Sequence, residues 1–187
     1  MNVYDFDGTI YHGDSSVDFY LYCIRKKPLI LLKSIGTQLA GAVLYKAGRL
    51  SKTQFKERYF CFLNFIRVDD ALLQAFWHEK EAKIKRWYLE QKQPDDLVIS
   101  ASPDFLLRPI CRTLGVSLIA TPVDPATGRF EGENCRGEEK VRRFREEFPG
   151  AVIDRFYTDS TADLPLSAIS RESFFVKGDV ISPMTKT

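Results

Sequence analysis

The spacing of hydrophobic and polar positions divides the chain into two parts. Between positions 14 and 92, apolar residues recur three or four positions apart, which is the period of an amphipathic helix. After Pro94 the pattern changes to short apolar runs, such as Leu97–Ile99, that alternate with helical stretches. The sequence therefore predicts an all-helical segment inserted into an α/β chain.

Residues 14–92 contain start and stop signals for four helices. A polar residue that can accept the first free backbone amides, or a proline in the first turn, precedes each one. These signals are Asp14 with Ser15, Pro28, the capping box Ser51–Gln54, and Asp69. The second helix is expected to run to about Lys46, and the fourth to extend through Trp87 before Pro94 ends it.

The remaining sequence predicts strands and helices in alternation. After a first strand at Val3–Tyr4, strands are expected at Leu97–Ile99, Val116–Ala120, Ala151–Tyr157 and Phe174–Val176. Helices are expected from Ser102 to Gly115, from Val141 to Phe148 and from Leu164 to Ile169, with a hairpin turn at 124–128 that leads to a return strand at 129–131. Such alternation is typical of a largely parallel sheet covered on both faces. We therefore expect a Rossmann-like, three-layer α/β/α core.

The first strand leads into two aspartates, Asp5 and Asp7, followed at once by Gly8. Two carboxylates this close repel each other unless a cation lies between them, which favours a Mg²⁺ site with a carboxylate nucleophile. The alternative is a hairpin turn, since Asp-Gly is a common turn dipeptide. A calcium-binding EF-hand loop fits less well, because Ile10 stands where that loop needs glycine.

Further polar residues are expected at the same edge, because ligands of parallel sheets bind outside the carboxyl ends of the strands. Ser100 and Asp159 each follow an apolar strand, and Lys140 opens a helix. Taken singly, Ser100 reads as a strand-end hydroxyl, Lys140 as a solvated lysine, and Asp159 and Asp163 as helix-cap charges. Together they suit Mg²⁺ and a phosphate ester, whose oxygens the lysine and hydroxyl would bind.

Composition limits the functional classes further. The 187 residues are 44% hydrophobic, which is enough for a packed core, and the net charge of +2 is too balanced to imply a nucleic acid partner. The four cysteines lack C-x-x-C spacing, and acidic residues stand where a signal peptide needs an apolar run. We expect a cytoplasmic protein without a zinc site or a disulfide framework.

The motifs resemble those of the haloacid dehalogenase superfamily of phosphatases. The matching residues are Asp5-Phe6-Asp7-Gly8-Thr9, then Ser100, then Lys140, then Asp159-Ser160-x-x-Asp163, in order across the chain. The helical insertion after the first motif is similar to subclass IB, which includes phosphoserine phosphatases and C-type phosphatidylglycerophosphatases. The resemblance implies a catalytic core of residues 1–13 and 93–187, and a helical cap of residues 14–92.

The resemblance also implies a role for each motif residue. Asp5 would be the nucleophile that becomes an aspartyl-phosphate, and Asp7 the general acid and then the base. Mg²⁺ would be held by Asp5, by the backbone carbonyl of Asp7 and by Asp159. Ser100 and Lys140 would bind phosphate with backbone amides near Phe6 and Gly8, and Asp163 would support the site. In the cap, Asp14 and Arg58 would contact the rest of the substrate.

Two function classes remain open on these residues. The first is a Mg²⁺-dependent phosphomonoesterase, and the second is a non-catalytic binding protein on the same fold. For an enzyme, we expect a small soluble ester similar to phosphoserine; a lipid phosphate is the alternative. In the first case the apolar helix after Arg25–Lys27 is buried within the cap, and in the second it contacts a membrane surface, although it is too short between Lys33 and Lys46 to span one. The oligomeric state is not determined by the sequence.

Overall fold

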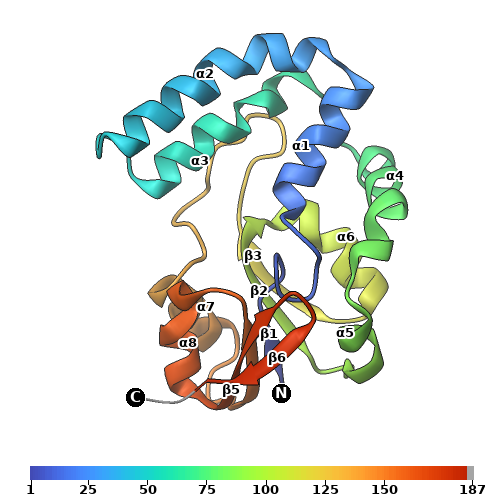
Figure 1. Cartoon of the computed structure of the whole chain (residues 1–187), viewed down its shortest axis with the longest axis vertical. Coiled ribbons are helices and arrows are strands. Elements are labelled where there is room, and N and C mark those ends of the chain that lie inside the picture. Colours follow the sequence, from blue (N-terminus) through green and yellow to red (C-terminus); the bar gives the residue numbers. More distant parts are fainter. Residues whose placement is uncertain (185–187) are drawn as a thin grey trace.

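A six-stranded sheet forms the centre of the computed structural model, which describes residues 1–184 (Figure 1). Its strands are β1 (Val3–Tyr4), β2 (Leu97–Pro103), β3 (Ser117–Thr121), β4 (Ile153–Thr158), β5 (Ser170–Lys177) and β6 (Val180–Pro183). They lie in the order β3-β2-β1-β4-β5-β6, and all pairs are parallel except β5 with β6. The expected α/β fold with a mostly parallel sheet is confirmed.

Consecutive residues of the central strand pack into different apolar clusters on the two faces of the sheet. Val3 joins the cluster that includes Val141 of α7 (Glu138–Glu147) and Leu166 of α8 (Leu164–Ile169). Tyr4 joins the cluster of α5 (Arg86–Gln91) and α6 (Asp104–Leu114), and its ring lies 4.9 Å from that of Tyr88. This alternation fixes the register, since a shift by one residue would exchange the faces.

The inserted segment forms α1 (Ser15–Lys26), α2 (Leu29–Lys46), α3 (Lys52–Phe60) and α4 (Asp70–Lys80), and α1 to α3 lie beyond one end of the sheet (Figure 1). The expected caps are present. Asp14 accepts the Val17 amide at 3.0 Å, Asp69 accepts the Leu72 amide at 3.0 Å, and Ser51 with Gln54 makes both bonds of a capping box. The helix starts were therefore legible in the sequence.

The predicted fourth helix is wrong at its C-terminal half. The observed helix, α4, ends at Lys80, and a 3₁₀ turn at Glu81–Lys83 separates it from α5. At this point the chain pairs with the loop that follows the Asp5 motif. Ile84 bridges to Tyr11, and the Lys85 amide donates to the Ile10 carbonyl at 2.8 Å. Those tertiary hydrogen bonds replace the helical ones.

The predicted start of the next helix at Ser102 is also wrong. Strand β2 continues to Pro103, and α6 begins at Asp104. The Ser102 amide donates to the hydroxyl of Ser100 at 3.1 Å, and the Ser102 hydroxyl donates to the carboxylate of Asp7. Ser102 therefore binds Asp7 at the carboxyl end of the sheet instead of capping a helix.

Two further differences concern short strands. The expected hairpin around 124–128 is reduced to a single bridge between Val123 and Phe130. Strand β6 was not predicted, because its four residues, partly or fully exposed at the sheet edge, carry no apolar alternation. Gly178, at φ +60°, provides the tight turn that brings β6 back against β5.

The expectation that the second helix is buried within the cap is wrong. Only Ile30, Ser34 and Gly41 of α2 are buried. The exposed large apolar side chains of this helix are Leu29, Leu31, Leu32, Ile35, Leu39, Val43 and Tyr45. Across residues 1–184, no helix has the length and apolar character that a membrane crossing requires. The division into a core and a cap stays a prediction, and α5, which lies in the proposed cap range, packs on the sheet.

Candidate active site

The sheet register brings three separate chain segments together at the carboxyl ends of the strands β2, β1 and β4. Tyr4 pairs with Val98 on one side and with Tyr157 on the other, so the residues that follow these positions emerge next to one another. They line one cavity of about 390 Å³. Seven of the predicted site residues lie there: Asp5, Asp7, Asp14, Ser100, Lys140, Asp159 and Asp163.

Lys140 is the centre of the ionic contacts in this cavity. Its ammonium group lies 2.8 Å from Asp5 Oδ1 and 2.8 Å from Asp163 Oδ2, although the lysine is only 1% exposed. Asp163 also accepts the hydroxyl of Thr158 at 2.9 Å. Because each partner is buried, this arrangement fixes Asp5 and Lys140 in position before any ligand binds.

The same burial changes the protonation equilibria. It raises the pKa of Asp5 to about 6, against the opposing effect of Lys140. Burial would lower the pKa of Lys140, but its two carboxylate neighbours outweigh this effect and hold the pKa above its ordinary value. Lys140 is therefore a permanent cation in the site, whereas Asp5 lacks full compensation for its charge.

Asp7 lies in a different environment two residues further along. Its Oδ1 accepts the amide of Ser15 at 2.6 Å, and its Oδ2 accepts the hydroxyl of Ser102. Protein surrounds the carboxyl group and Asp14 is near, which together raise its pKa to about 7 despite these hydrogen bonds. A carboxyl group with this pKa can give up and take back a proton near neutral pH.

Gly8 has a role that differs from the one predicted. Its amide donates to the carbonyl of Gly13 at 2.9 Å, so it closes the loop and is not free to bind phosphate. Its φ is +73°, and a Cβ atom there would lie 2.0 Å from Asp159 Oδ2. Glycine at this position therefore allows the Asp159 carboxylate to reach the backbone of the loop. The carbonyl of Phe6 accepts amides from the same loop, including that of Tyr11 at 3.0 Å.

The oxygen donors of the cavity suit Mg²⁺. Within the described residues, no group of three or more His, Cys, Asp or Glu side chains is arranged as a metal site. The predicted set does not need one, since it takes two carboxylates, Asp5 and Asp159, and the backbone carbonyl of Asp7. The carboxyl of Asp159 has a raised pKa, mainly from desolvation, as expected of an uncompensated charge that a cation would satisfy. A hard cation with few protein ligands fits this set.

Comparison with known proteins identifies the family. The family model of haloacid dehalogenase-like hydrolases matches residues 3–168, which is most of the chain. The protein belongs to the haloacid dehalogenase-like hydrolases. The prediction of an enzyme of this family is thus confirmed.

Individual proteins are similar to this chain in sequence or in fold. Protein CicA of Caulobacter vibrioides is 26% identical over 194 residues, which cover 90% of this chain and 82% of that protein. A protein of unknown function from Bordetella pertussis has the same fold, with a TM-score of 0.69 and 23% identity over 89% of this chain and 84% of its own. A probable phosphoserine phosphatase from Vibrio cholerae gives a TM-score of 0.63 at 10% identity, over 92% of this chain and 55% of its own.

The structure separates the two predicted substrate contacts of this hydrolase. Asp14 lines the cavity, where it also caps α1. Arg58 does not line it. The carbon stem of Arg58 packs on α2, where a Cβ atom on Gly41 would lie 2.9 Å from Arg58 Cβ, and its side chain lines a separate hollow with Glu57. Arg58 is therefore a helix-packing residue.

Several residues of the cavity were missed by sequence reasoning. Lys56 of α3 donates to the carbonyl of Ala101 at 2.7 Å and to Asn134 Oδ1 at 3.1 Å. Lys52 and Arg136 also line the cavity. Helical spacing gave a weak signal for α3, because Lys52 and Lys56 are four residues apart and thus share a face.

Lys85 is a further residue that the sequence did not indicate. It is 1% exposed and donates to the carbonyls of Gly8 at 2.6 Å and Gly178 at 2.5 Å. Burial lowers its pKa, and the nearby carboxylates of Asp179 and Asp159 only partly oppose this. Lys85 thus ties the loop after Asp7 to the turn between β5 and β6.

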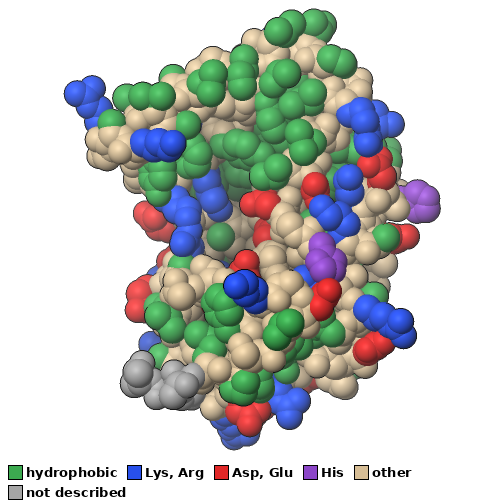
Figure 2. Space-filling view, in the orientation of Figure 1, with side chains coloured by type: hydrophobic (Ala, Val, Ile, Leu, Met, Phe, Trp, Pro, Cys, Tyr) green, Lys and Arg blue, Asp and Glu red, His purple; other side chains and the backbone are tan. Residues whose placement is uncertain are grey.

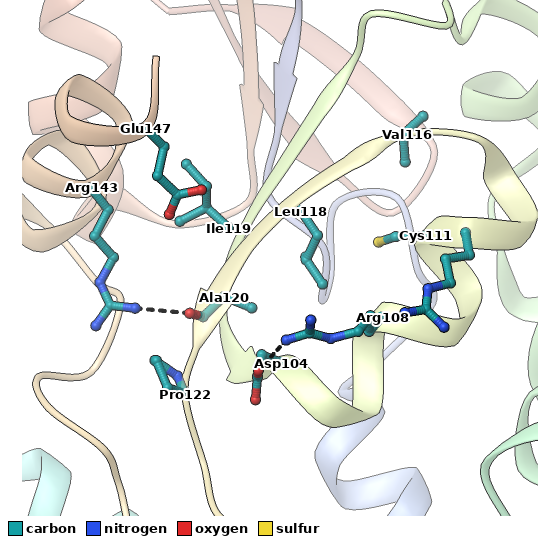
Figure 3. A pocket seen from close by; sticks show the side chains of 11 residues that line it. Asp104, Arg108, Cys111, Val116, Leu118, Ile119, Ala120, Pro122, Arg143 and Glu147 are labelled. Atoms are coloured by element: carbon teal, nitrogen blue, oxygen red, sulfur yellow. Dashed lines mark hydrogen bonds and ion pairs between the residues drawn. The ribbon is translucent and has the colours of Figure 1, made fainter. Parts of the chain in front are cut away.

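A separate hollow of about 450 Å³ lies between α6, β3 and α7 (Figure 3). It contains none of the predicted site residues. Two of its arginines have partners within the hollow, since Arg143 donates to the carbonyl of Ala120 at 2.9 Å and Arg108 pairs with Asp104 at 2.6 Å. The candidate active site is therefore the cavity at the carboxyl ends of the strands, which Asp5, Asp7 and Lys140 line.

Proposed function

We propose that this hydrolase is a Mg²⁺-dependent phosphomonoesterase that acts through an aspartyl-phosphate on Asp5. The observation that carries the proposal is the buried contact of Lys140 with Asp5, with Asp7 two residues away in an environment that raises its pKa to about 7. A positioned carboxylate and a protonated carboxyl group are the two functions that cleavage of a phosphate ester requires.

In the first half-reaction an oxygen of Asp5 attacks phosphorus, and the bond from phosphorus to the ester oxygen breaks. Asp7 donates its proton to that oxygen, so the product leaves as a neutral alcohol. Ser100, Lys140 and the Phe6 amide bind the phosphate oxygens and stabilise the charge on them. When bound, Mg²⁺ reduces the repulsion between the phosphate and the carboxylates.

In the second half-reaction water attacks the phosphorus of the aspartyl-phosphate. Asp7, now ionised, takes the proton from this water, and the bond between phosphorus and Asp5 breaks. Inorganic phosphate leaves and both aspartates return to their first state. Asp163 keeps Lys140 in place throughout, because its carboxylate holds the ammonium group at 2.8 Å.

The helical segment 14–92 acts in this proposal as a cap that limits access of water and contacts the substrate beyond its phosphate. We propose a small phosphate ester, with Asp14, Lys52 and Lys56 as the cap residues that contact it, because these residues line the cavity. Arg58 is left out of this set, since it points into another hollow.

The test is phosphate release from a panel of esters by the purified chain. The panel includes phosphoserine, a sugar phosphate, 4-nitrophenyl phosphate and phosphatidylglycerophosphate, each with Mg²⁺ and with EDTA. We expect turnover of at least one ester, loss of that turnover in EDTA, and recovery when Mg²⁺ is added back. Turnover that persists in EDTA contradicts the metal requirement, and a folded chain that hydrolyses none of the esters contradicts the phosphatase.

A further inference from the structure

The outer face of α2 is apolar and has no partner in the described chain. Leu32 is 74% exposed, Val43 67%, Leu29 66% and Leu39 59%. Three of these, Leu32, Leu39 and Val43, are spaced by seven and four positions, so they lie along one face of the helix. Figure 2 shows hydrophobic side chains over the upper part of the molecule, where Figure 1 places α2.

The opposite face of α2 accounts for its attachment to the protein. Ile30, Ser34 and Gly41 are its buried residues, and Gly41 lies against Arg58 of α3. Helix α2 packs on the protein through few residues. Its outer face is apolar although it is not buried against the protein core, which is the usual reason for an apolar helix face.

The charged residues of the segment that contains α2 have one sign, although Arg25 at its start pairs with Glu79 of α4. Residues 19–56 contain eight Lys and Arg and no Asp or Glu, so the remaining chain has 19 basic and 25 acidic residues. Arg25, Lys26 and Lys27 precede α2, Lys33 lies within it, and Lys46 ends it, and all five are exposed. The apolar face therefore lies within a strongly cationic segment of a protein that is otherwise anionic.

Charge decides between the occupants of such a face. A second copy of this chain, related by a two-fold axis, would bring two cationic segments together. An anionic lipid surface matches both properties, since apolar side chains enter the acyl boundary while Lys and Arg contact the headgroups. We propose that α2, with the Arg25–Lys27 end of α1, binds the surface of a membrane that contains anionic lipids.

This binding does not depend on the proposed phosphatase, but it has a consequence for the site. Helix α3 packs against α2, and its Lys52 and Lys56 line the candidate active site. A membrane bound to the outer face of α2 is thus separated from α3, which lines the cavity, only by α2 itself. The segment lies on the surface and does not cross it, since α2 has only 18 residues and Lys33 is the fifth of them.

Sedimentation with vesicles tests the proposal on the full chain. We expect the protein to pellet with vesicles of equal phosphatidylglycerol and phosphatidylcholine, and at least tenfold less with phosphatidylcholine alone. Binding should fall again in about 1 M salt, where the screening length is about 3 Å. Failure to bind the anionic vesicles at low salt overturns the proposal.

Matched variants assign the binding to α2. The triple variant Leu32→Ser, Leu39→Ser, Val43→Ser should lower vesicle binding at least tenfold. Its thermal unfolding should stay close to that of the wild type, and its rate of hydrolysis of a soluble ester should stay within about twofold. The control changes three exposed apolar residues elsewhere, Leu89→Ser, Val152→Ser and Val180→Ser, which are 45%, 48% and 70% exposed. Equal loss in both variants, or a dimer that only the α2 variant dissociates, contradicts the lipid assignment.

Discussion

The candidate active site and helix α2 treat charge and apolar surface in opposite ways. At the sheet edge a lysine is buried between two carboxylates, each 2.8 Å from its ammonium group. On α2, apolar side chains are exposed, and every charged residue from position 19 to position 56 is basic. In the first region the charged groups have partners within the chain. In the second, no part of the chain among residues 1–184 covers the exposed apolar side chains.

This difference shows what total composition conceals. A net charge of +2 indicates a balanced protein, although it is the sum of a cationic helical segment and an anionic remainder. Burial of charge is costly unless a partner is fixed beside it. The buried charges at the carboxyl end of the sheet therefore indicate a functional site from the structure of this chain alone. An exposed apolar helix reports a function only through what it binds.

Replacement of the nucleophile should have the largest effect. Asp5→Asn should abolish turnover, because an amide does not attack phosphorus, while Lys140 keeps its contact with Asp163 and the fold is retained. Steady-state phosphate release and thermal unfolding measure the two outcomes. Asp5→Glu is the control for charge, and it should also be inactive because the longer side chain displaces the carboxylate. Near-normal release by Asp5→Asn would exclude Asp5 as the nucleophile.

Loss of the general acid should be the next largest effect. Asp7→Asn should slow hydrolysis of an alkyl phosphate by roughly a hundredfold or more, since its leaving oxygen needs a proton. The loss should be much smaller for 4-nitrophenyl phosphate, whose leaving group is stable as an anion. Paired kcat/KM values for the two esters measure this, and an equal loss for both would assign Asp7 a different role.

A methyl group at Gly8 should disturb the site more than the fold. Gly8→Ala would place Cβ 2.0 Å from Asp159 Oδ2, so the Mg²⁺ concentration for half-maximal activity should rise at least tenfold. Gly115→Ala is the matched control, because Gly115 has φ +72° and nothing within 4 Å of the added atom. Both should lose about 1 kcal/mol of stability from the left-handed backbone. The same Mg²⁺ requirement in both variants would show that Asp159 does not depend on Gly8.

Two basic residues of α3 provide the finest test, since they lie two positions apart and face different hollows. Lys56→Met should raise KM for the best soluble ester by roughly tenfold, as expected for loss of a charged contact. Arg58→Met should leave KM within about twofold, because its stem packs on α2 and methionine retains part of that contact. Equal shifts in KM would return Arg58 to the substrate site.

Much of the fold was predictable, because local signals and tertiary packing agree there. The N-caps Asp14, Ser51 and Asp69 and the short apolar strands are found where the pattern indicated them. Predictions were wrong where tertiary hydrogen bonds replaced the local preference. Ser102 bonds to Asp7 instead of capping a helix, and the chain at Ile84 pairs with Tyr11 instead of extending α4.

The candidate site was predictable in part for a similar reason. Asp5, Ser100 and Asp159 follow strands, so the parallel topology alone brings them together. Lys56 lies within α3 and Lys85 directly precedes α5, and neither belongs to a motif. They were missed because only the packing of the helical segment 14–92 brings them to the cavity and the loop. Periodicity also misled for α2, since an apolar helix has the same pattern whether a protein or another surface covers it.

The most direct test of the central claim is the location of phosphate on the enzyme during turnover. The wild-type chain is mixed with its best ester and Mg²⁺, quenched in acid within the first turnovers, digested and examined by mass spectrometry. The account predicts phosphate on the peptide that contains Asp5, and none on that peptide from Asp5→Asn treated in the same way. Phosphate on another residue, or rapid turnover with no phosphorylated peptide at any quench time, would contradict it.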